Sequence, residues 1–168
     1  MYSDTTYDLA GASLSSPNPN AWVPFGLPLR AAGWAALPVT PGTKVPGSYA
    51  RPMAGWREVA LAPSEYDVDE WSRAPELGVC VVLGPQLVDA DEWHLVAVDI
   101  DADDAAPTAA EVLGQLPGRV IKRRGRKGFV QFFRARPGAI ANAKWGKVAD
   151  ILADGRQAVL PPTRHPDA

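Results

Sequence analysis

Two aspartates with one residue between them end an apolar segment, and their types and spacing suit metal chemistry. The segment reads Leu95-Val-Ala-Val-Asp99-Ile-Asp101. Side chains of a strand alternate between its faces, so Asp99 and Asp101 are expected on one face at the strand end. Neighbouring carboxylates resist joint ionisation, and Mg²⁺ or Mn²⁺ with oxygen ligands would neutralise both. A solvated acidic loop that continues through Asp103 and Asp104 is the alternative interpretation.

A third acid has a similar setting. Asp150 lies inside the apolar run Val148-Ala-Asp150-Ile-Leu. A lone charge among apolar side chains is costly, so the carboxylate should face a partner, an ion or solvent. It either joins Asp99 and Asp101 in one site or belongs to an edge strand with one exposed face.

A cluster of cations surrounds one glycine between two predicted strands. The stretch Lys122-Arg-Arg-Gly-Arg-Lys127 carries five basic side chains. Such a turn can hold phosphate through guanidinium groups and backbone N–H groups, or it can be a solvated hairpin tip. Cations next to metal-binding carboxylates are the combination that phosphoryl transfer requires. Trp145, between Lys144 and Lys147, is either a packing residue or a residue that stacks on a base.

The elements that must position these residues follow from apolar periodicity and turn residues. We expect a helix within 21–33, a loop over 41–63, and helices over 64–72, capped by Ser64, and 107–116, led by Asp103 or Asp104. Strands are predicted over 34–39, 78–83, 94–100, 119–123, 128–134, 148–152 and 156–160. The pairs 119–123 with 128–134 and 148–152 with 156–160 are predicted hairpins. An α/β half therefore precedes a mostly antiparallel half.

Composition sets the broad class. The chain has 168 residues, 46% of them hydrophobic, which suffices for one globular domain with a core. Its net charge of −2 gives no global electrostatic attraction to nucleic acid. Residues 1–20 read as a flexible arm. The single cysteine, Cys80, reads as a buried thiol. We expect a cytoplasmic protein without a membrane partner.

In order and spacing, these motifs resemble the primase-polymerase domain of the archaeo-eukaryotic primase superfamily, of the plasmid and phage replication type. The resemblance extends from about Leu27 to Pro166. It rests on Ala-Gly-Trp34 with Gly-Thr-Lys44-Val-Pro, Gly78-Val-Cys-Val-Val-Leu-Gly84, Val-Asp99-Ile-Asp101, and Asp150-Ile with Pro161-Pro-Thr-Arg-His165-Pro.

The resemblance implies an α+β fold with an RRM-like antiparallel catalytic sheet and an adjoining N-terminal α/β unit, together making a catalytic domain over 21–168. It also implies that Asp99, Asp101 and Asp150 bind two Mg²⁺ or Mn²⁺ ions for template-directed nucleotidyl transfer. That activity is DNA primase or DNA polymerase activity in plasmid, phage or mobile-element replication. The implied partners are a single-stranded DNA template and primer, dNTPs or NTPs, and a helicase on the same or another chain.

One motif departs from the family pattern. The family's second motif carries a histidine after a glycine turn, and the stretch Gly125-Arg-Lys-Gly-Phe-Val has none. We expect Arg126 and Lys127 to supply positive charge in its place. Arg124 of the same basic turn, Lys44 and His165 of the closing motif are the further candidates for nucleotide binding. The departure also leaves open a weak or inactive binding module for nucleotides or single-stranded DNA. A metal-dependent nuclease is a further alternative.

Overall fold

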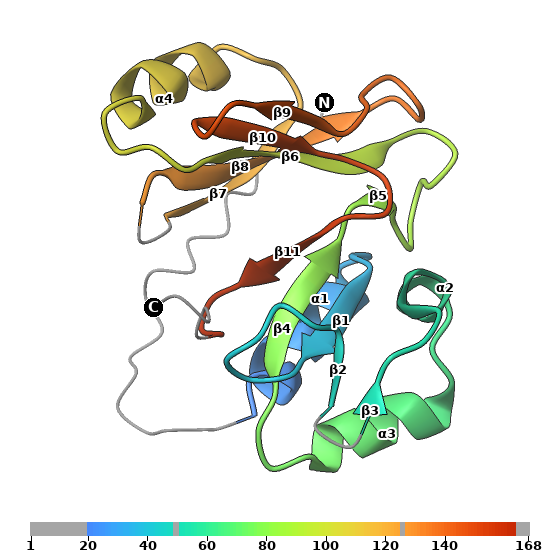
Figure 1. The fold of residues 1–168 in the computed structure, drawn as a ribbon. Coiled ribbons are helices and arrows are strands. Elements are labelled where there is room, and N and C mark those ends of the chain that lie inside the picture. Colours follow the sequence, from blue (N-terminus) through green and yellow to red (C-terminus); the bar gives the residue numbers. More distant parts are fainter. Residues whose placement is uncertain (1–19, 49–50, 125–126, 164–168) are drawn as a thin grey trace.

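The structure, a computed structural model, describes residues 20–48, 51–124 and 127–163. Within these residues the strands form a six-stranded sheet (the larger sheet), a three-stranded sheet (the smaller sheet) and a short two-stranded ladder. All pairings between these strands are antiparallel. Figure 1 shows the two main sheets as stacked layers. Over the same ranges no helix has the length and apolar character needed to cross a membrane.

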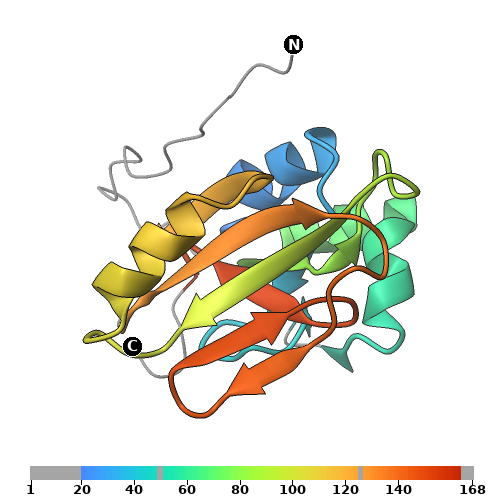
Figure 2. The same ribbon diagram turned by 90° about the horizontal axis from the view of Figure 1, so that it is seen from above.

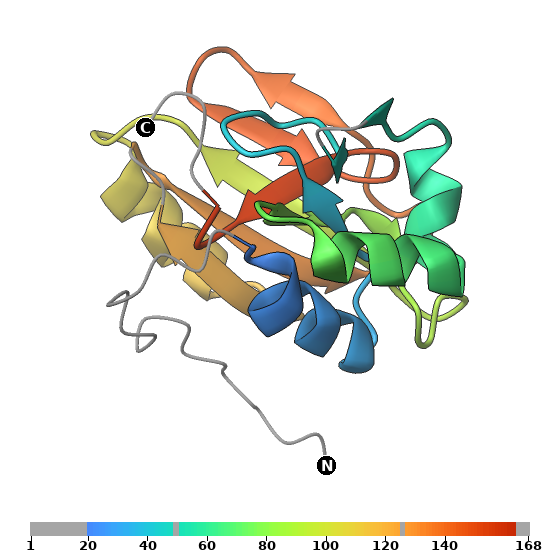
Figure 3. The same cartoon turned by 90° about the horizontal axis from the view of Figure 1, so that it is seen from below.

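The smaller sheet has the strand order β1-β4-β11. Its strands are β1 (Ala36–Val39), β4 (Gly78–Val82) and β11 (Gln157–Leu160). Every residue of β1 and β4 is buried, which explains why both read as continuous apolar runs rather than alternating ones. A π-helical turn (Trp22–Gly26) leads into α1 (Leu27–Ala31), and α2 (Trp56–Leu61) and α3 (Glu65–Arg73) follow β1. Figure 3 shows α1 and α3 on the underside of this sheet.

Side-chain contacts fix α3 in place. The Ser64 hydroxyl accepts a hydrogen bond from the Asp67 N–H, and the Asp67 carboxylate accepts one from the Ser64 N–H, which makes a capping box. The buried ring of Trp71 meets Trp22 edge-to-face at 5.0 Å between centroids. The predicted cap at Ser64 is therefore confirmed.

The larger sheet has the order β7-β8-β6-β10-β9, and β5 pairs with β6 off this path. Its strands are β5 (Gly84–Pro85), β6 (His94–Ile100), β7 (Arg119–Arg124), β8 (Phe129–Ala135), β9 (Ala143–Trp145) and β10 (Ala149–Leu152). Helix α4 (Ala106–Gly114) connects β6 to β7 and covers one face of the sheet (Figure 2).

The two faces of the larger sheet pack against different partners. On the α4 face, Val96 and Phe133 are buried against Leu113 of the helix. On the opposite face, Ala97, Val130 and Phe132 belong to the core cluster that also contains β1, β4 and β11. Alternation along β6 therefore puts Val96 and Val98 under α4, and Ala97 and Asp99 toward the smaller sheet.

The chain passes from the smaller to the larger sheet between β4 and β5 and returns between β10 and β11, and these two crossings lie side by side. The Leu83 N–H donates to the Arg156 carbonyl (2.8 Å), and the Gly155 N–H donates to the Leu83 carbonyl (3.3 Å). Nearby, His94 Nδ1 lies 3.0 Å from Asp154 Oδ1. The two chain crossings thus lie near the beginning of β6, and the Asp99 end of that strand lies away from them.

Most predicted elements are present, and two expectations are wrong. The expected loop over 41–63 contains α2 and the short ladder β2 (Gly47–Ser48) with β3 (Arg51–Pro52). The expected hairpin of 148–152 with 156–160 does not form, because β10 pairs with β6 and β9, whereas β11 pairs with β4. The stretch with Asp103 and Asp104 leads into α4 as expected, although neither side chain caps the helix: Asp104 accepts from the Ala105 N–H and Asp103 from the Gly128 N–H.

The fold is α+β, with mixed helices and antiparallel sheets. The N-terminal unit also has an antiparallel sheet, so its strands are not arranged as in parallel α/β folds. The predicted arm over 1–20 lies outside the described residues except for Asn20, which is buried and donates to the carbonyls of Trp71 and Ala74.

Gly128→Ala is expected to destabilise the protein more than an ordinary glycine replacement. Gly128 has φ +56°, and an added Cβ would collide with the Ile100 carbonyl at the end of β6. A left-handed conformation alone costs about 1–2 kcal/mol for a residue with a Cβ, and the collision adds to this. Gly42→Ala is the matched control, because Gly42 has φ +70° with nothing within 4 Å of the new methyl. Urea unfolding compares the two, and equal losses would contradict the close approach.

Candidate active site

Pairing of β6 with β10 brings two of the predicted carboxylates together. Asp99 lies directly opposite Asp150 in the ladder. Residues opposite each other on antiparallel strands have Cβ atoms about 4.5–5.5 Å apart and project from the same face. Both aspartates are half-buried. Asp101 follows β6 immediately and is exposed, and its N–H donates to the Val148 carbonyl (2.9 Å), so backbone pairing holds it next to β10.

The same ladder row extends across the larger sheet. Lys144 on β9 is opposite Asp150, Val130 on β8 is opposite Asp99, and Arg123 on β7 is opposite Val130. From β9 to β7, the face toward the smaller sheet therefore presents a cation, two acids, an apolar residue and a second cation, side by side across the strands. Lys144 Nζ lies 3.7 Å from Asp150 Oδ2.

Arg123 is the cation that lies deepest in the site. One guanidinium nitrogen, Nη1, donates to the Val159 carbonyl of β11, which joins the two sheets next to the carboxylates. Its Nε is buried and has no partner in the described part of the chain. A buried donor without a partner costs free energy. The Arg123 guanidinium can therefore still gain from a further hydrogen-bond acceptor.

The electrostatic couplings link these residues into one cluster. Burial raises the pKa of Asp99, and the Asp101 carboxylate raises that pKa further, with a smaller contribution from Asp150. Arg123 and Lys44 act in the opposite direction on Asp99. Burial lowers the pKa of Arg123, while Asp99 and Asp101 raise it. Ionisation of Asp99 therefore costs free energy in this position, and a bound cation would reduce that cost.

The predicted nucleotide-binding residues lie around this cluster to different extents. Lys44 is exposed in the loop after β1, near enough to act on Asp99, and its carbonyl accepts from the Gln157 side chain. Lys127 is exposed in the bend that precedes β8. Arg124 pairs with Phe129 at the end of β7. Arg126 and His165 lie outside the described residues.

Carboxylate oxygens are the donors that a hard divalent ion prefers. In the described ranges no group of three or more His, Cys, Asp and Glu side chains converges closely enough to hold a metal. Asp99 and Asp150 nevertheless face each other, and Mg²⁺ is commonly bound by one or two carboxylates together with substrate phosphates. Burial raises the pKa of Asp99, and the carboxylates of Asp101 and Asp150 raise it further, so a cation bound there would favour the ionised form of Asp99.

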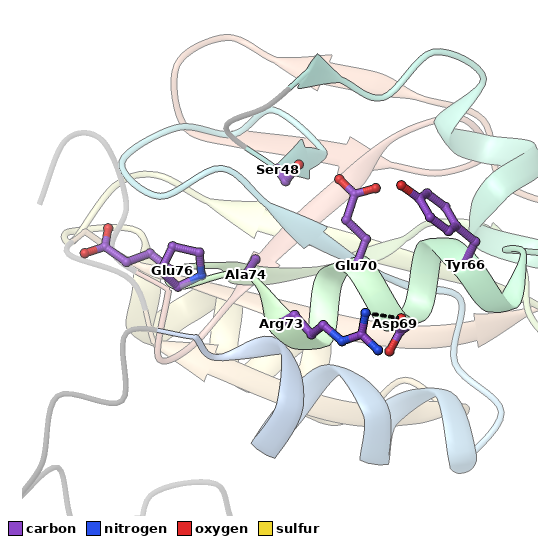
Figure 4. A pocket seen from close by; sticks show the side chains of 8 residues that line it. Ser48, Tyr66, Asp69, Glu70, Arg73, Ala74 and Glu76 are labelled. Atoms are coloured by element: carbon purple, nitrogen blue, oxygen red, sulfur yellow. Dashed lines mark ion pairs between the residues drawn. The ribbon is translucent and has the colours of Figure 1, made fainter.

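A pocket outside the carboxylate cluster is a second candidate site. It has a volume of about 450 Å³ and lies against α3, where the side chains of Tyr66, Glu70 and Glu76 line it (Figure 4). Asp69 and Arg73 form an ion pair on its wall (2.8 Å). Arg73, the cation in its lining, is paired with Asp69, whereas Arg123, Lys44 and Lys144 flank the carboxylate cluster on the larger sheet, which is therefore the better candidate for nucleotide chemistry.

Sequence reasoning missed Arg123 and Lys144 as members of the site. Both lie in segments singled out for charge, but the candidates chosen nearby were Arg124, Arg126 and Lys127. The signal that selects Arg123 is its position in the ladder. It can be found only when the register of β7, β8 and β6 is known.

The family model for the N-terminal domain of bifunctional DNA primase/polymerase (Prim-Pol) matches residues 27–168, most of the chain. No curated protein and no solved structure matches significantly.

Proposed function

Because this chain belongs to the bifunctional DNA primase/polymerase N-terminal family, we propose that it performs template-directed nucleotidyl transfer at Asp99, Asp101 and Asp150. Family membership indicates primase/polymerase activity in general, with DNA and nucleotides as substrates. The assignment of the chemistry to these three aspartates is our proposal. The observation that supports it is the cross-strand pair Asp99–Asp150 with Asp101 beside it, flanked by cations.

In the reaction we propose, a primer 3′-hydroxyl, or that of a first nucleotide, attacks the α-phosphate of a bound triphosphate. The new bond joins that oxygen to the α-phosphorus, the bond to the β-phosphate bridging oxygen breaks, pyrophosphate leaves, and the hydroxyl proton passes to solvent. Asp99 and Asp150, with Asp101, would hold Mg²⁺ or Mn²⁺, which supplies neutralisation of phosphate charge and activation of the hydroxyl. The three carboxylates orient the reacting groups on one face of the sheet.

The cations around the acids are assigned to the triphosphate. The Nε of Arg123 has no hydrogen-bond partner among the described residues, and Arg123 lies on the same ladder row as Asp99. Lys44 approaches the same acid from the smaller sheet's side. We include Arg124, Arg126, Lys127 and His165 among the nucleotide-binding residues on the basis of the sequence. A helicase partner and a role in plasmid, phage or mobile-element replication rest on the family resemblance.

A nucleotide or single-stranded DNA binding module of the same fold is the second candidate. The observation that favours it is Val130, because β8 presents this apolar side chain to Asp99 rather than a histidine. An extension reaction then lacks one polar contact to the triphosphate, and Arg123 on β7 would have to replace that contact.

A gel assay separates the possible functions. The protein is incubated with a labelled primer on a single-stranded template, and with template alone, in the presence of Mn²⁺ or Mg²⁺ and dNTPs or NTPs. We expect metal-dependent products longer than the primer. A shortened primer would instead indicate a nuclease, and an unchanged primer together with measurable dNTP binding would indicate the binding module.

A further inference from the structure

Strand β9 forms an outer edge of the larger sheet and carries the most exposed large apolar side chain found in the described residues. Trp145 is 77% exposed, and all three residues of β9 are exposed. Seen from the α4 side in Figure 2, the helix lies over the β7–β8 side of the sheet and leaves β9 and β10 uncovered. Trp145 is therefore available to a partner and has no packing role that explains a tryptophan there.

The ladder register places an aromatic residue and a cation on the two sides of this edge. Trp145 is opposite Ala149 and projects from the side of the sheet away from the carboxylates. Lys144 is opposite Asp150, projects from the carboxylate side and is 73% exposed along its side chain. Lys147 follows in the exposed turn to β10. A ligand that passes over the edge of β9 would meet the indole and then the lysine beside Asp150.

We propose that Trp145 and Lys147 form a contact site for single-stranded DNA on the outer edge of β9, with the indole stacking on a base. The inference deepens the proposed function and rests on it, since it names a contact for the DNA strand on β9, the edge strand that pairs with the Asp150 strand β10. An exposed indole stacks on any base, and the nearby lysine neutralises backbone phosphate. The short strand offers little area to a folded protein partner, and the net charge of −2 gives no broad surface for duplex DNA.

The proposal is tested by DNA binding without nucleotides or metal, so that its failure is distinguishable from failure of the chemistry. A fluorescent oligo-dT is titrated with wild type, Trp145→Ala, Trp145→Phe and Lys147→Ala, and its anisotropy is followed. We expect Trp145→Ala to weaken binding about 10-fold and Trp145→Phe to retain most of the affinity, as loss of one stacked base predicts. Lys147→Ala should reduce the salt dependence of binding.

Tyr66→Ala is the matched control, because Tyr66 is a second exposed aromatic side chain (70%) on α3, beside the acidic pocket. Its binding curve should equal that of wild type. Unchanged affinity in Trp145→Ala, or no oligo-dT binding by wild type, would overturn the proposal and leave the nucleotidyl-transfer proposal standing. A change in oligomeric mass in Trp145→Ala with unchanged affinity would also overturn it, in favour of edge pairing between two copies of the chain.

Discussion

Asp99→Asn is expected to lower the rate of primer extension by about 10³-fold or more at saturating nucleotide and Mn²⁺. Asparagine keeps the shape of the side chain and removes the charge opposite Asp150, so the pair no longer provides two anionic ligands on one face. Single-nucleotide extension measures the rate. Asp104→Asn is the matched control, since Asp104 belongs to the same acidic stretch but accepts a hydrogen bond from Ala105 outside the cluster.

The same variant is expected to be at least as stable as wild type without metal. The pKa of Asp99 is raised in the folded state, so the folded protein binds this proton more tightly than the unfolded chain. The wild-type free energy of unfolding should therefore fall as pH rises from the ordinary aspartate pKa through the folded value, and Asp99→Asn should lack this fall. Mn²⁺ should raise the Tm of wild type more than that of the variant. If Mn²⁺ raised the Tm of both proteins equally, Asp99 would not be a metal ligand.

Arg123→Ala is expected to change nucleotide and metal binding in opposite directions. Loss of a charge-assisted contact should raise the KM for dNTP about 10- to 100-fold. Removing a cation beside Asp99 and Asp101 should make Mn²⁺ binding tighter, because less positive charge competes for the carboxylates. Steady-state extension gives the KM, and Mn²⁺-dependent Tm shifts give the metal affinity. Arg123→Lys, which keeps the charge, should restore part of the nucleotide affinity.

Lys122→Ala controls for changes to β7 itself. Lys122 is the preceding residue, projects to the opposite face and lies 3.8 Å from the Phe129 ring centroid. It should leave the dNTP KM unchanged. If Arg123→Ala weakens metal and nucleotide binding alike and Arg123→Lys restores neither, the arginine acts only through its hydrogen bond to Val159, as a residue that holds the sheets together.

The placement of the acids could be predicted because it depends on local alternation. Asp99 and Asp101 end one apolar strand, and Asp150 interrupts another, so each was expected at a strand face. The register of β6 with β10 then places Asp99 opposite Asp150. Their role as metal ligands stays a prediction that the mutants test.

The features that the sequence did not predict depend on strand pairings between segments that are distant in the chain. The turn between β10 and β11 is compatible with a hairpin, but β4 needs a second partner and β11 provides it. Strand β9 is short and exposed, so it has no alternating pattern to find. Arg123 is distinguished from Arg124 only by the β7–β8 register, which shifts at a bulge between Arg119 and Ile121.

The chain leaves the smaller sheet after β4 and returns to it only at β11, so the two sheets should not form at the same time during folding. Strands β5 to β10 are contiguous, so the larger sheet can assemble as soon as that segment is synthesised. The central strand of the smaller sheet, β4, pairs with β1 and with β11, and the whole larger sheet lies between β4 and β11 in the chain. Such a distant pairing forms slowly because a long loop must close first. Strand β11 also carries the Val159 carbonyl that binds Arg123, so the candidate site is complete only when this late strand docks.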